Sequence, residues 1–377
     1  MIRQPISIFL LRFVAPLLAS LAFAAHPAAQ ISLSGSVFDG SGGPLLTGQI
    51  YHLTGNVTVP TGQTLTVQAG AIVKSPSFQI SVAGSMIVQG TALDPAIFTS
   101  LEDDSAGGDS NGNGPSSGSP GDWVGISVNS SGTLMADHMV VRYAGMGSAG
   151  GLNNQGVLSL SNSTVQDSLF TGLRLNMSQS ILGVTGCTFQ DNGSYAVEGV
   201  RLDVVPAFSN NTASGNGLGD YMRIQHAMPA MDTTITTANL IGGVAVITAN
   251  STIPSGVTLR MEAGVVVKWA GNLRQTVDGT LELAGTVANP VVYTVLEDDD
   301  YGGDTNKDGP SSGVPGAWQG ILNNNGGAVN ANESILRYAG SGFLGAIQST
   351  GVLTLTNSTL SDSFTTPLKL ALSAQVP

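Results

Sequence analysis

The chain has 377 residues with 50 glycines, a single cysteine, 13 basic and 25 acidic residues, and a formal charge of −12. One cysteine excludes a small disulfide-stapled domain, and the acidic balance without a basic stripe argues against a nucleic-acid partner. A hydrophobic content of 42% indicates a packed interior rather than disorder.

Residues 1–24 have the pattern of a cleaved secretory signal peptide. Arg3 and Arg12 accompany a short apolar run that ends in the small-residue site Ala22-Phe23-Ala24, and Ala29 offers a second cleavage point. A short membrane anchor is the alternative, disfavoured because a span needs about 20 apolar residues. We therefore expect an exported protein with no membrane span after cleavage, in which residues 25–56 form an N-terminal cap.

The rest of the sequence contains a long internal duplication. Residues 57–175 recur as residues 251–370, with a shift of 194 and then 195, which predicts a first copy over 57–250 and a second, incomplete copy over 251–377. Within the first copy, a finer period of 24 residues relates Ser163-Thr164-Val165, Cys187-Thr188-Phe189 and Asn211-Thr212-Ala213.

A 24-residue unit of short alternating strands buries its apolar face only by stacking on a neighbour. The period therefore predicts an all-β fold, a right-handed parallel β-helix of about 12–14 coils. A pair of β-sandwiches is the alternative. It is disfavoured because sandwich strands need not repeat at a fixed spacing and antiparallel hairpins favour Asn-Gly turns.

Three segments carry a resemblance to a known family: residues 65–70 (LTVQAG), residues 279–286 (GTLELAGT), and the coil pattern at 163–165 and 187–193. In these segments the chain resembles the secreted bacterial right-handed parallel β-helix proteins of the pectin-lyase-like superfamily. That superfamily includes lyases, hydrolases, adhesins and coat proteins, so the resemblance implies an architecture rather than an activity. It also implies asparagines stacked at the coil corners, with Asn162, Asn210 and Asn357 as candidates.

Two acidic loops, residues 101–121 and 296–316, are the most distinctive chemical feature. Residues 101–126 and 296–321 are identical at 18 of 26 positions. Oxygen donors alternate and are followed by glycine, as in the first half of an EF-hand loop, but Pro315 stands where that motif has its glutamate. Such a donor set suits Ca²⁺ better than Mg²⁺.

The predicted metal ligands include two acidic residues at the start of each loop that fold back across a glycine pair. The ligands are Asp103, Asp104, Asp109, Asn111 and Asn113 in the first loop, and Asp298, Asp299, Asp304, Asn306 and Asp308 in the second. The first loop carries less charge and is expected to bind Ca²⁺ more weakly. A solvated acidic turn is the alternative for both loops.

Aromatic and basic residues recur beside the loops. Trp123 and Trp318 are expected to pack as lids where the chain rejoins the coil, with stacking on a sugar as the alternative. Lys74 recurs as Lys268, and Arg142 recurs as Arg337. A base present in both copies is expected to serve the coil, for instance by capping corner carbonyls. No catalytic residue is assigned, because five scattered carboxylates cannot be paired across a groove by spacing alone: Asp137, Asp167, Asp191, Glu198 and Asp203.

The leading hypothesis is a non-catalytic, exported surface module of the adhesin or carbohydrate-contacting type. Ca²⁺ would brace it, and its partner would be an extracellular polysaccharide or a cell-surface component. The alternative is a calcium-dependent polysaccharide lyase or glycoside hydrolase acting on an acidic glycan, as the resemblance allows. Ice binding through stacked threonines such as Thr164, Thr188 and Thr212 is a third, disfavoured by the lack of a regular Thr-x-Thr ladder. Residues 371–377 make a poor cap, which predicts a truncated copy or a docking end.

Overall fold

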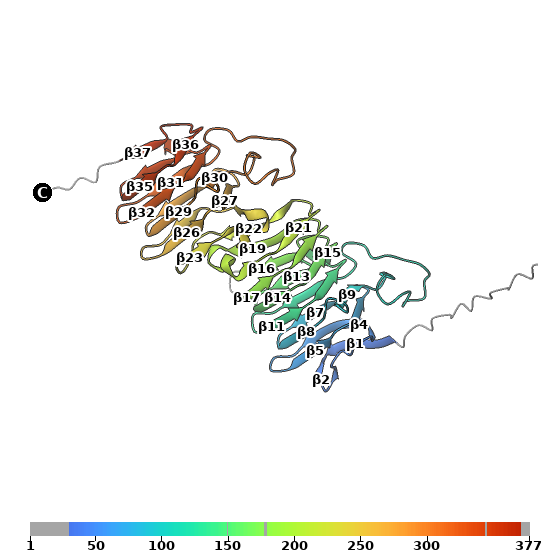
Figure 1. Ribbon diagram of the computed structural model, residues 1–377. Coiled ribbons are helices and arrows are strands. Elements are labelled where there is room, and N and C mark those ends of the chain that lie inside the picture. The colour runs from blue at the N-terminus through green and yellow to red at the C-terminus, as the bar shows by residue number, and fades with distance from the viewer. Residues whose placement is uncertain (1–29, 149, 177–178, 344, 371–377) are drawn as a thin grey trace, which may run out of the picture.

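The computed structural model describes residues 30–148, 150–176, 179–343 and 345–370, which form an elongated rod of about 14 stacked coils (Figure 1). The predicted signal peptide and residues 371–377 lie outside the described residues. Named strands pair in parallel throughout the rod, and the predicted parallel β-helix is confirmed. Among the described residues, an antiparallel pairing of the kind that sandwiches require occurs only as an isolated bridge between Phe38 and Ser41.

In the first copy, strands of successive coils stack in three columns, here named A, B and C. Column A contains β6 (Ile72–Ser75), β9 (Ala96–Ser100), β12 (Met139–Arg142), β15 (Thr164–Gln166), β18 (Thr188–Gln190) and β21 (Thr212–Ser214). Column B contains β7 (Gln79–Val82), β10 (Gly125–Val128), β13 (Leu152–Asn154), β16 (Leu173–Leu175), β19 (Tyr195–Arg201) and β22 (Gly219–His226). Column C contains β5 (Thr64–Gln68), β8 (Ser85–Gln89), β11 (Thr133–Asp137), β14 (Val157–Ser161), β17 (Ser180–Thr185) and β20 (Phe208–Ser209).

One long strand forms the start of two columns at the N-terminal end of the rod. β4 (Ile50–Val59) pairs with β6 through its first half and with β7 through its second, and so begins columns A and B together. β1 (Gln30–Ser36) pairs with β4 on the outer side, followed by the short β2 (Phe38–Asp39) and β3 (Gly42–Gly43). These strands cover the N-terminal end of the rod, within the segment expected to be the cap.

From β23 onward, through the end of the first copy and the second copy, the strands again stack in three columns. One column contains β24 (Val244–Ile247), β27 (Val266–Trp269), β30 (Val291–Val295), β33 (Ser334–Arg337) and β36 (Thr359–Ser361). A second contains β25 (Ser251–Ile253), β28 (Arg274–Val277), β31 (Gly320–Asn323), β34 (Ile347–Ser349) and β37 (Leu368–Leu370). A third contains β23 (Thr233–Ile235), β26 (Thr258–Glu262), β29 (Thr280–Ala284), β32 (Ala328–Asn332) and β35 (Val352–Thr356).

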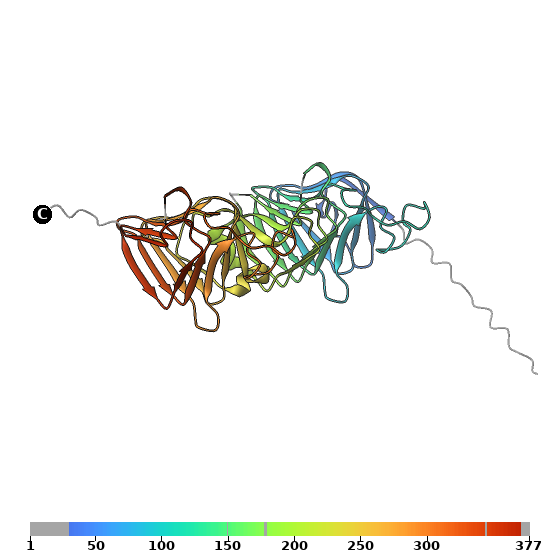
Figure 2. The same cartoon turned by 90° about the horizontal axis from the view of Figure 1, so that it is seen from above.

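The two copies are joined with a shift of one column. By the duplication, β27 is the counterpart of β6 in column A, because Lys268 corresponds to Lys74. Its column nevertheless continues column B, since β24 pairs with β22. By strand pairing, the second-copy column equivalent to column A therefore continues column B of the first copy. The acidic loops join β9 to β10 and β30 to β31. Figure 2 shows the two copies one after the other along the rod.

Alternation within the strands builds the interior. β5, β14 and β26 each bury their second and fourth residues and leave the residues between them partly exposed. Most of the buried apolar side chains form one cluster that extends from Leu33 to Ile347, and Tyr221, Val244 and Val246 form a second, smaller one. Short 3₁₀ helices lie between coils and at the junction: η1 (Met146–Ser148), η2 (Leu202–Ala207), η3 (Thr237–Asn239), η4 (Ile241–Gly243) and η5 (Ser341–Phe343). None of the helices in the described ranges has the length and apolar character needed to cross a membrane.

Left-handed residues mark the coil corners at the predicted period. Asn162 and Asn210 have φ values of 48° and 54°, a region that asparagine tolerates better than most residues, and Asn357 has 49°. All three side chains are exposed, so they occupy corners without forming a buried stack. The stacked asparagines are instead Asn192 and Asn216, both buried, with Nδ2 of Asn192 donating to Oδ1 of Asn216 at 2.8 Å.

Cys187 provides a test of the packing in this part of the coil. Its side chain is 1% exposed, and burial raises the pKa of the thiol from 9.0 to about 11. The thiol of the folded protein stays protonated at a higher pH than the thiol of the unfolded chain. The resulting contribution to the free energy of unfolding, about 2–3 kcal/mol, is therefore complete below pH 9 and is lost as the pH rises through 11. In urea denaturation, the stability difference between the native chain and Cys187→Ala should therefore shrink across this range. A difference independent of pH would contradict the buried thiol.

Candidate metal centre

A buried lysine fastens each acidic loop to the rod. Lys74 of β6 and Lys268 of β27 are fully buried, and their Nζ atoms donate to the carbonyl oxygens of Gly108 and Gly303 at 2.8 and 2.6 Å. Burial lowers the pKa of both amines, and the nearby loop carboxylates partly offset this effect. Both lysines are therefore structural, but the carbonyls that they cap belong to the acidic loops and not to the coil corners that the sequence suggested.

An Asp–Arg pair lies at the base of each loop. Asp103 is 1% exposed and Asp298 is fully buried. Nη2 of Arg142 lies 2.6 Å from Oδ2 of Asp103, and Nη1 of Arg337 lies 3.4 Å from Oδ2 of Asp298. In both copies a threonine hydroxyl from the preceding strand donates to the same carboxylate at 2.5 Å. Asp103 and Asp298 therefore point into the rod, away from the other predicted ligands.

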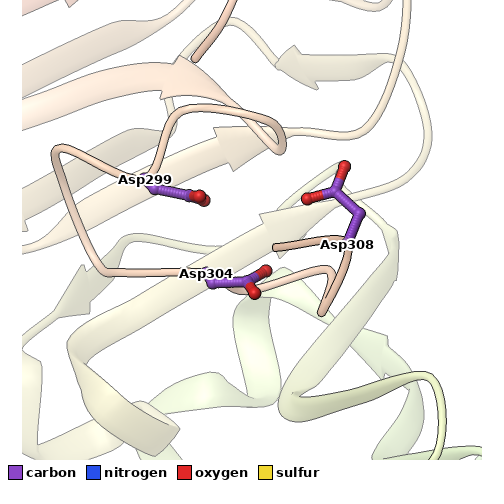
Figure 3. Close-up of side chains that lie close together, drawn as sticks. All are labelled: Asp299, Asp304 and Asp308. Carbon is purple, nitrogen blue, oxygen red and sulfur yellow. The ribbon is translucent and has the colours of Figure 1, made fainter. Parts of the chain in front are cut away.

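Three carboxylates converge in the second loop. Oxygen atoms of Asp299, Asp304 and Asp308 lie within 4.8 Å of one another, and Figure 3 shows the three side chains facing a common space. The backbone N–H of Ser311 donates to Oδ2 of Asp299 at 2.7 Å and holds the two limbs of the loop together. Like charges at this separation repel one another, and a bound cation would remove that cost.

Unpartnered oxygen atoms accompany the three carboxylates. Oδ1 of Asp299 and Oδ1 of Asn306 are inaccessible to solvent and accept no hydrogen bond from the described residues. A buried acceptor without a partner costs about 1–3 kcal/mol. Carboxylate and amide oxygens are the ligands that Ca²⁺ prefers. The donor set of the second loop therefore fits a hard divalent cation.

The first loop uses its polar side chains differently. Oδ1 of Asp104 is buried without a partner, like its counterpart in the second loop. The carboxylate of Asp109, however, accepts hydrogen bonds from two glycine N–H groups at 2.7 and 3.0 Å. The amides of Asn111 and Asn113 donate to Glu102 at 3.1 and 2.6 Å. Within the described ranges, a cluster of three acidic ligands is found in the second loop alone.

Lys307 of the second loop was not predicted from the sequence to have a role. Its φ is 60°, a left-handed conformation that the first loop fills with Gly112. Nζ of Lys307 lies 2.8 Å from Oδ2 of Asp220 and 2.5 Å from the carbonyl oxygen of Asn216, both in the first copy. This side chain ties the second loop to the preceding copy beside a cavity of about 130 Å³. The only sign of this role in the sequence was that the second loop has lysine where the first has Gly112.

Both loop tryptophans are interior residues. Trp123 is 1% exposed and Trp318 is fully buried, and each Nε1 donates at 2.8 Å to a backbone carbonyl, of Arg142 or Arg337. Their predicted role as lids where the chain rejoins the coil is confirmed. Stacking on a sugar is excluded because neither ring has an exposed face.

The scattered carboxylates have local partners or lie at corners. Asp203 pairs with Arg201 at 2.8 Å, and Oδ1 of Asp137 accepts from Nδ2 of Asn162 at 2.9 Å. Glu198 lies between two arginines on column B. The other two, Asp167 and Asp191, occupy left-handed corner positions.

No family model and no curated protein matches the chain. Among solved structures, the chain is similar to one described as the crystal structure of a TibC-catalysed, hyper-glycosylated TibA fragment. The two chains are 13% identical with a TM-score of 0.26, and the match covers 89% of this chain and 96% of the other. At this level of similarity, neither a family nor an activity follows from the comparison.

Proposed function

We propose that the chain is an exported, non-catalytic surface module of the pectin-lyase-like β-helix type. In this proposal, Ca²⁺ braces its acidic loops and the rod contacts an extracellular polysaccharide or another cell-surface component. The observation that carries the proposal is the convergence of Asp299, Asp304 and Asp308 beside the unpartnered oxygen of Asn306. A cation held there would stiffen a loop that protrudes from an otherwise regular rod.

The contacts of the duplicated bases support a non-catalytic role. Lys74 and Lys268 are fully buried and donate to loop carbonyls, and Arg142 and Arg337 are paired with buried aspartates. A base for proton abstraction must instead reach the substrate within hydrogen-bond distance. These four duplicated bases are therefore committed to holding the loops.

The leader at residues 1–24 supports export, because its basic residues, apolar run and small-residue cleavage site match a secretory signal. An exported rod with a single, buried cysteine has no intramolecular disulfide to stabilise it. Metal binding to the folded state is one way to supply that stability. Export and bracing by Ca²⁺ are therefore consistent parts of one proposal.

Calcium titration tests the bracing. Ca²⁺ at a hundred times its Kd should raise the free energy of unfolding by about 2.7 kcal/mol, seen as a higher Tm that a chelator reverses. Asp308→Asn gives the second loop the donor that the first has at Asn113, and should weaken binding by about tenfold or more in calorimetry. The reverse change, Asn113→Asp, should strengthen binding to the first loop.

Asp94→Asn is the matched control, because Asp94 is exposed in a turn between β8 and β9, away from the loops. It should leave both Ca²⁺ affinity and Tm unchanged. Absence of Ca²⁺ binding, or equal effects of Asp94→Asn and Asp308→Asn on Ca²⁺ affinity, would contradict the bracing by Ca²⁺. Calcium-dependent release of unsaturated sugars from an acidic polysaccharide would show that the protein is a lyase rather than a non-catalytic module.

A further inference from the structure

A polar groove lies on column B, mostly in the part of the chain that the second copy lacks. It has a volume of about 380 Å³, and its lining includes Arg174, Glu198, Arg223, Gln225 and His226. These residues come from β16, β19 and β22, which lie side by side in Figure 1. Four of the five fall within residues 176–250, where no duplicate exists to suggest a role in the regular coil.

A β-bulge shapes the groove. β7, β10, β13 and β16 pair along column B without irregularity, whereas the register between β19 and β22 shifts at three places, two of them around Glu198 and Val200. Gly199 has a φ of 78°, and a Cβ there would come within 2.1 Å of the carbonyl oxygen of Leu175, so only glycine fits. Bulges re-aim side chains and are frequent beside functional sites.

Charge concentrates at this bulge. Nε of Arg174 lies 3.4 Å from Oε1 of Glu198, and Nη1 of Arg223 lies 3.7 Å from Oε2 of the same carboxylate. The guanidinium of Arg223 also lies over the ring of Tyr195, 5.0 Å from its centre, which fixes its direction. The two guanidiniums and the one carboxylate of this cluster sum to a formal charge of +1, on a chain of −12.

The coils that precede Arg174 carry uncharged residues at the same position. The positions paired in line with Arg174 in those coils are Ser81, Ser127 and Asn153. Arg174 recurs in the second copy as the basic residue Lys369, whereas Glu198 and Arg223 have no counterpart there. The coils before Arg174 therefore stack without the cluster of Arg174, Glu198 and Arg223.

We propose that this groove binds a saccharide that bears an oxyanion, either a carboxylate or a sulfate. The guanidiniums of Arg174 and Arg223 bind the oxyanion, since planar guanidinium groups match its geometry. Glu198 and Gln225 bind sugar hydroxyls beside it. This inference rests on the proposed function in one respect, because it locates the polysaccharide contact; it does not depend on Ca²⁺.

Calorimetry on the full chain tests the site with three probes of equal length: a glucuronate-containing hexasaccharide, a sulfated hexasaccharide and a neutral hexasaccharide. Either or both anionic probes should bind, with an affinity that falls as salt is added, and the neutral probe should bind at least tenfold more weakly. The two anionic probes distinguish carboxylate from sulfate as the preferred group.

Arg223→Gln should weaken binding of the anionic probe by about tenfold or more, because a charge-assisted contact is lost. Glu198→Gln should preserve or tighten it, since the competing carboxylate is removed. Arg260→Gln is the matched control. Arg260 also pairs with glutamates on the rod, at 2.7 Å, but two carboxylates, Glu262 and Glu282, surround that one guanidinium. The Kd of Arg260→Gln for the anionic probe should stay within about twofold of the native value.

Equal Kd values for Arg223→Gln and Arg260→Gln, neutral binding as tight as anionic binding, or no binding of any probe would overturn the inference. The separate Ca²⁺ titration keeps the two proposals distinct. Saccharide binding without Ca²⁺ binding would contradict the bracing by Ca²⁺ and support the saccharide site in the groove. Binding of an anionic probe that Arg223→Gln does not change would support the polysaccharide contact but contradict its location in this groove.

Discussion

Replacing Arg337 with alanine should lower the free energy of unfolding by about 3–5 kcal/mol, because it leaves a fully buried carboxylate, Asp298, without its charged partner. Arg337 is 15% exposed and also contacts Asp300 at 2.9 Å and Asp362 at 3.5 Å. It thus connects the acidic loop to the coil beneath and to the one that follows. Urea denaturation of the native chain and the variant measures the loss.

Two further variants separate the buried charge from a general loss of an arginine. In Arg337→Ala with Asp298→Ala, no unpaired carboxylate remains, so the loss should be smaller than in Arg337→Ala alone. Arg260→Ala removes an arginine that is 39% exposed and should cost at most about 1 kcal/mol. If Arg337→Ala costs no more than Arg260→Ala, the pair does not secure the loop.

The coil repeat follows directly from the spacing of residues in the sequence. Thr164, Thr188 and Thr212 recur every 24 residues, and they are paired directly with one another in adjacent coils. A fixed period with two-residue alternation has few solutions other than stacked coils, because each unit must cover the apolar face of the next. The period therefore determined the architecture without any knowledge of the partners along the rod.

The shift of strand pairing by one column between the two copies was beyond prediction. A duplicated sequence repeats its strands but carries no information about which column its first strand will join. That choice depends on β22, which continues column B and pairs with β24, the strand that begins the column of β27. The junction lies in the unduplicated segment, where there was no repeat to compare.

The acidic loop was predicted in part. Asp299, Asp304 and Asp308 converge as expected, with Asp299 folding back toward the glycine-rich turn. Asp298, expected beside it, is instead fully buried and accepts a hydrogen bond from the hydroxyl of Thr294. Its burial could not be anticipated, since its partner Arg337 lies 39 residues further along the chain.

Trp318→Ala is the second change with a large expected effect, about 3–5 kcal/mol of lost stability, because it opens a cavity in the fully buried interior. The ring of Trp318 stacks on Trp269 with 5.1 Å between centres and an interplanar angle of 5°, and Tyr293 tilts against both rings at 6.3 Å. Aromatic pairs add about 0.5–1.5 kcal/mol beyond the area that they bury.

The first copy supplies the control for this stack. Trp123 holds the equivalent position, but the duplication places Ser75 where the second copy has Trp269 and Phe98 where it has Tyr293. Trp123→Ala should therefore cost less than Trp318→Ala by about 1 kcal/mol in urea denaturation. Equal losses would mean that the stack adds nothing beyond buried area. A larger loss for Trp318 would mean that the lid over the three-aspartate loop is the more strongly secured of the two.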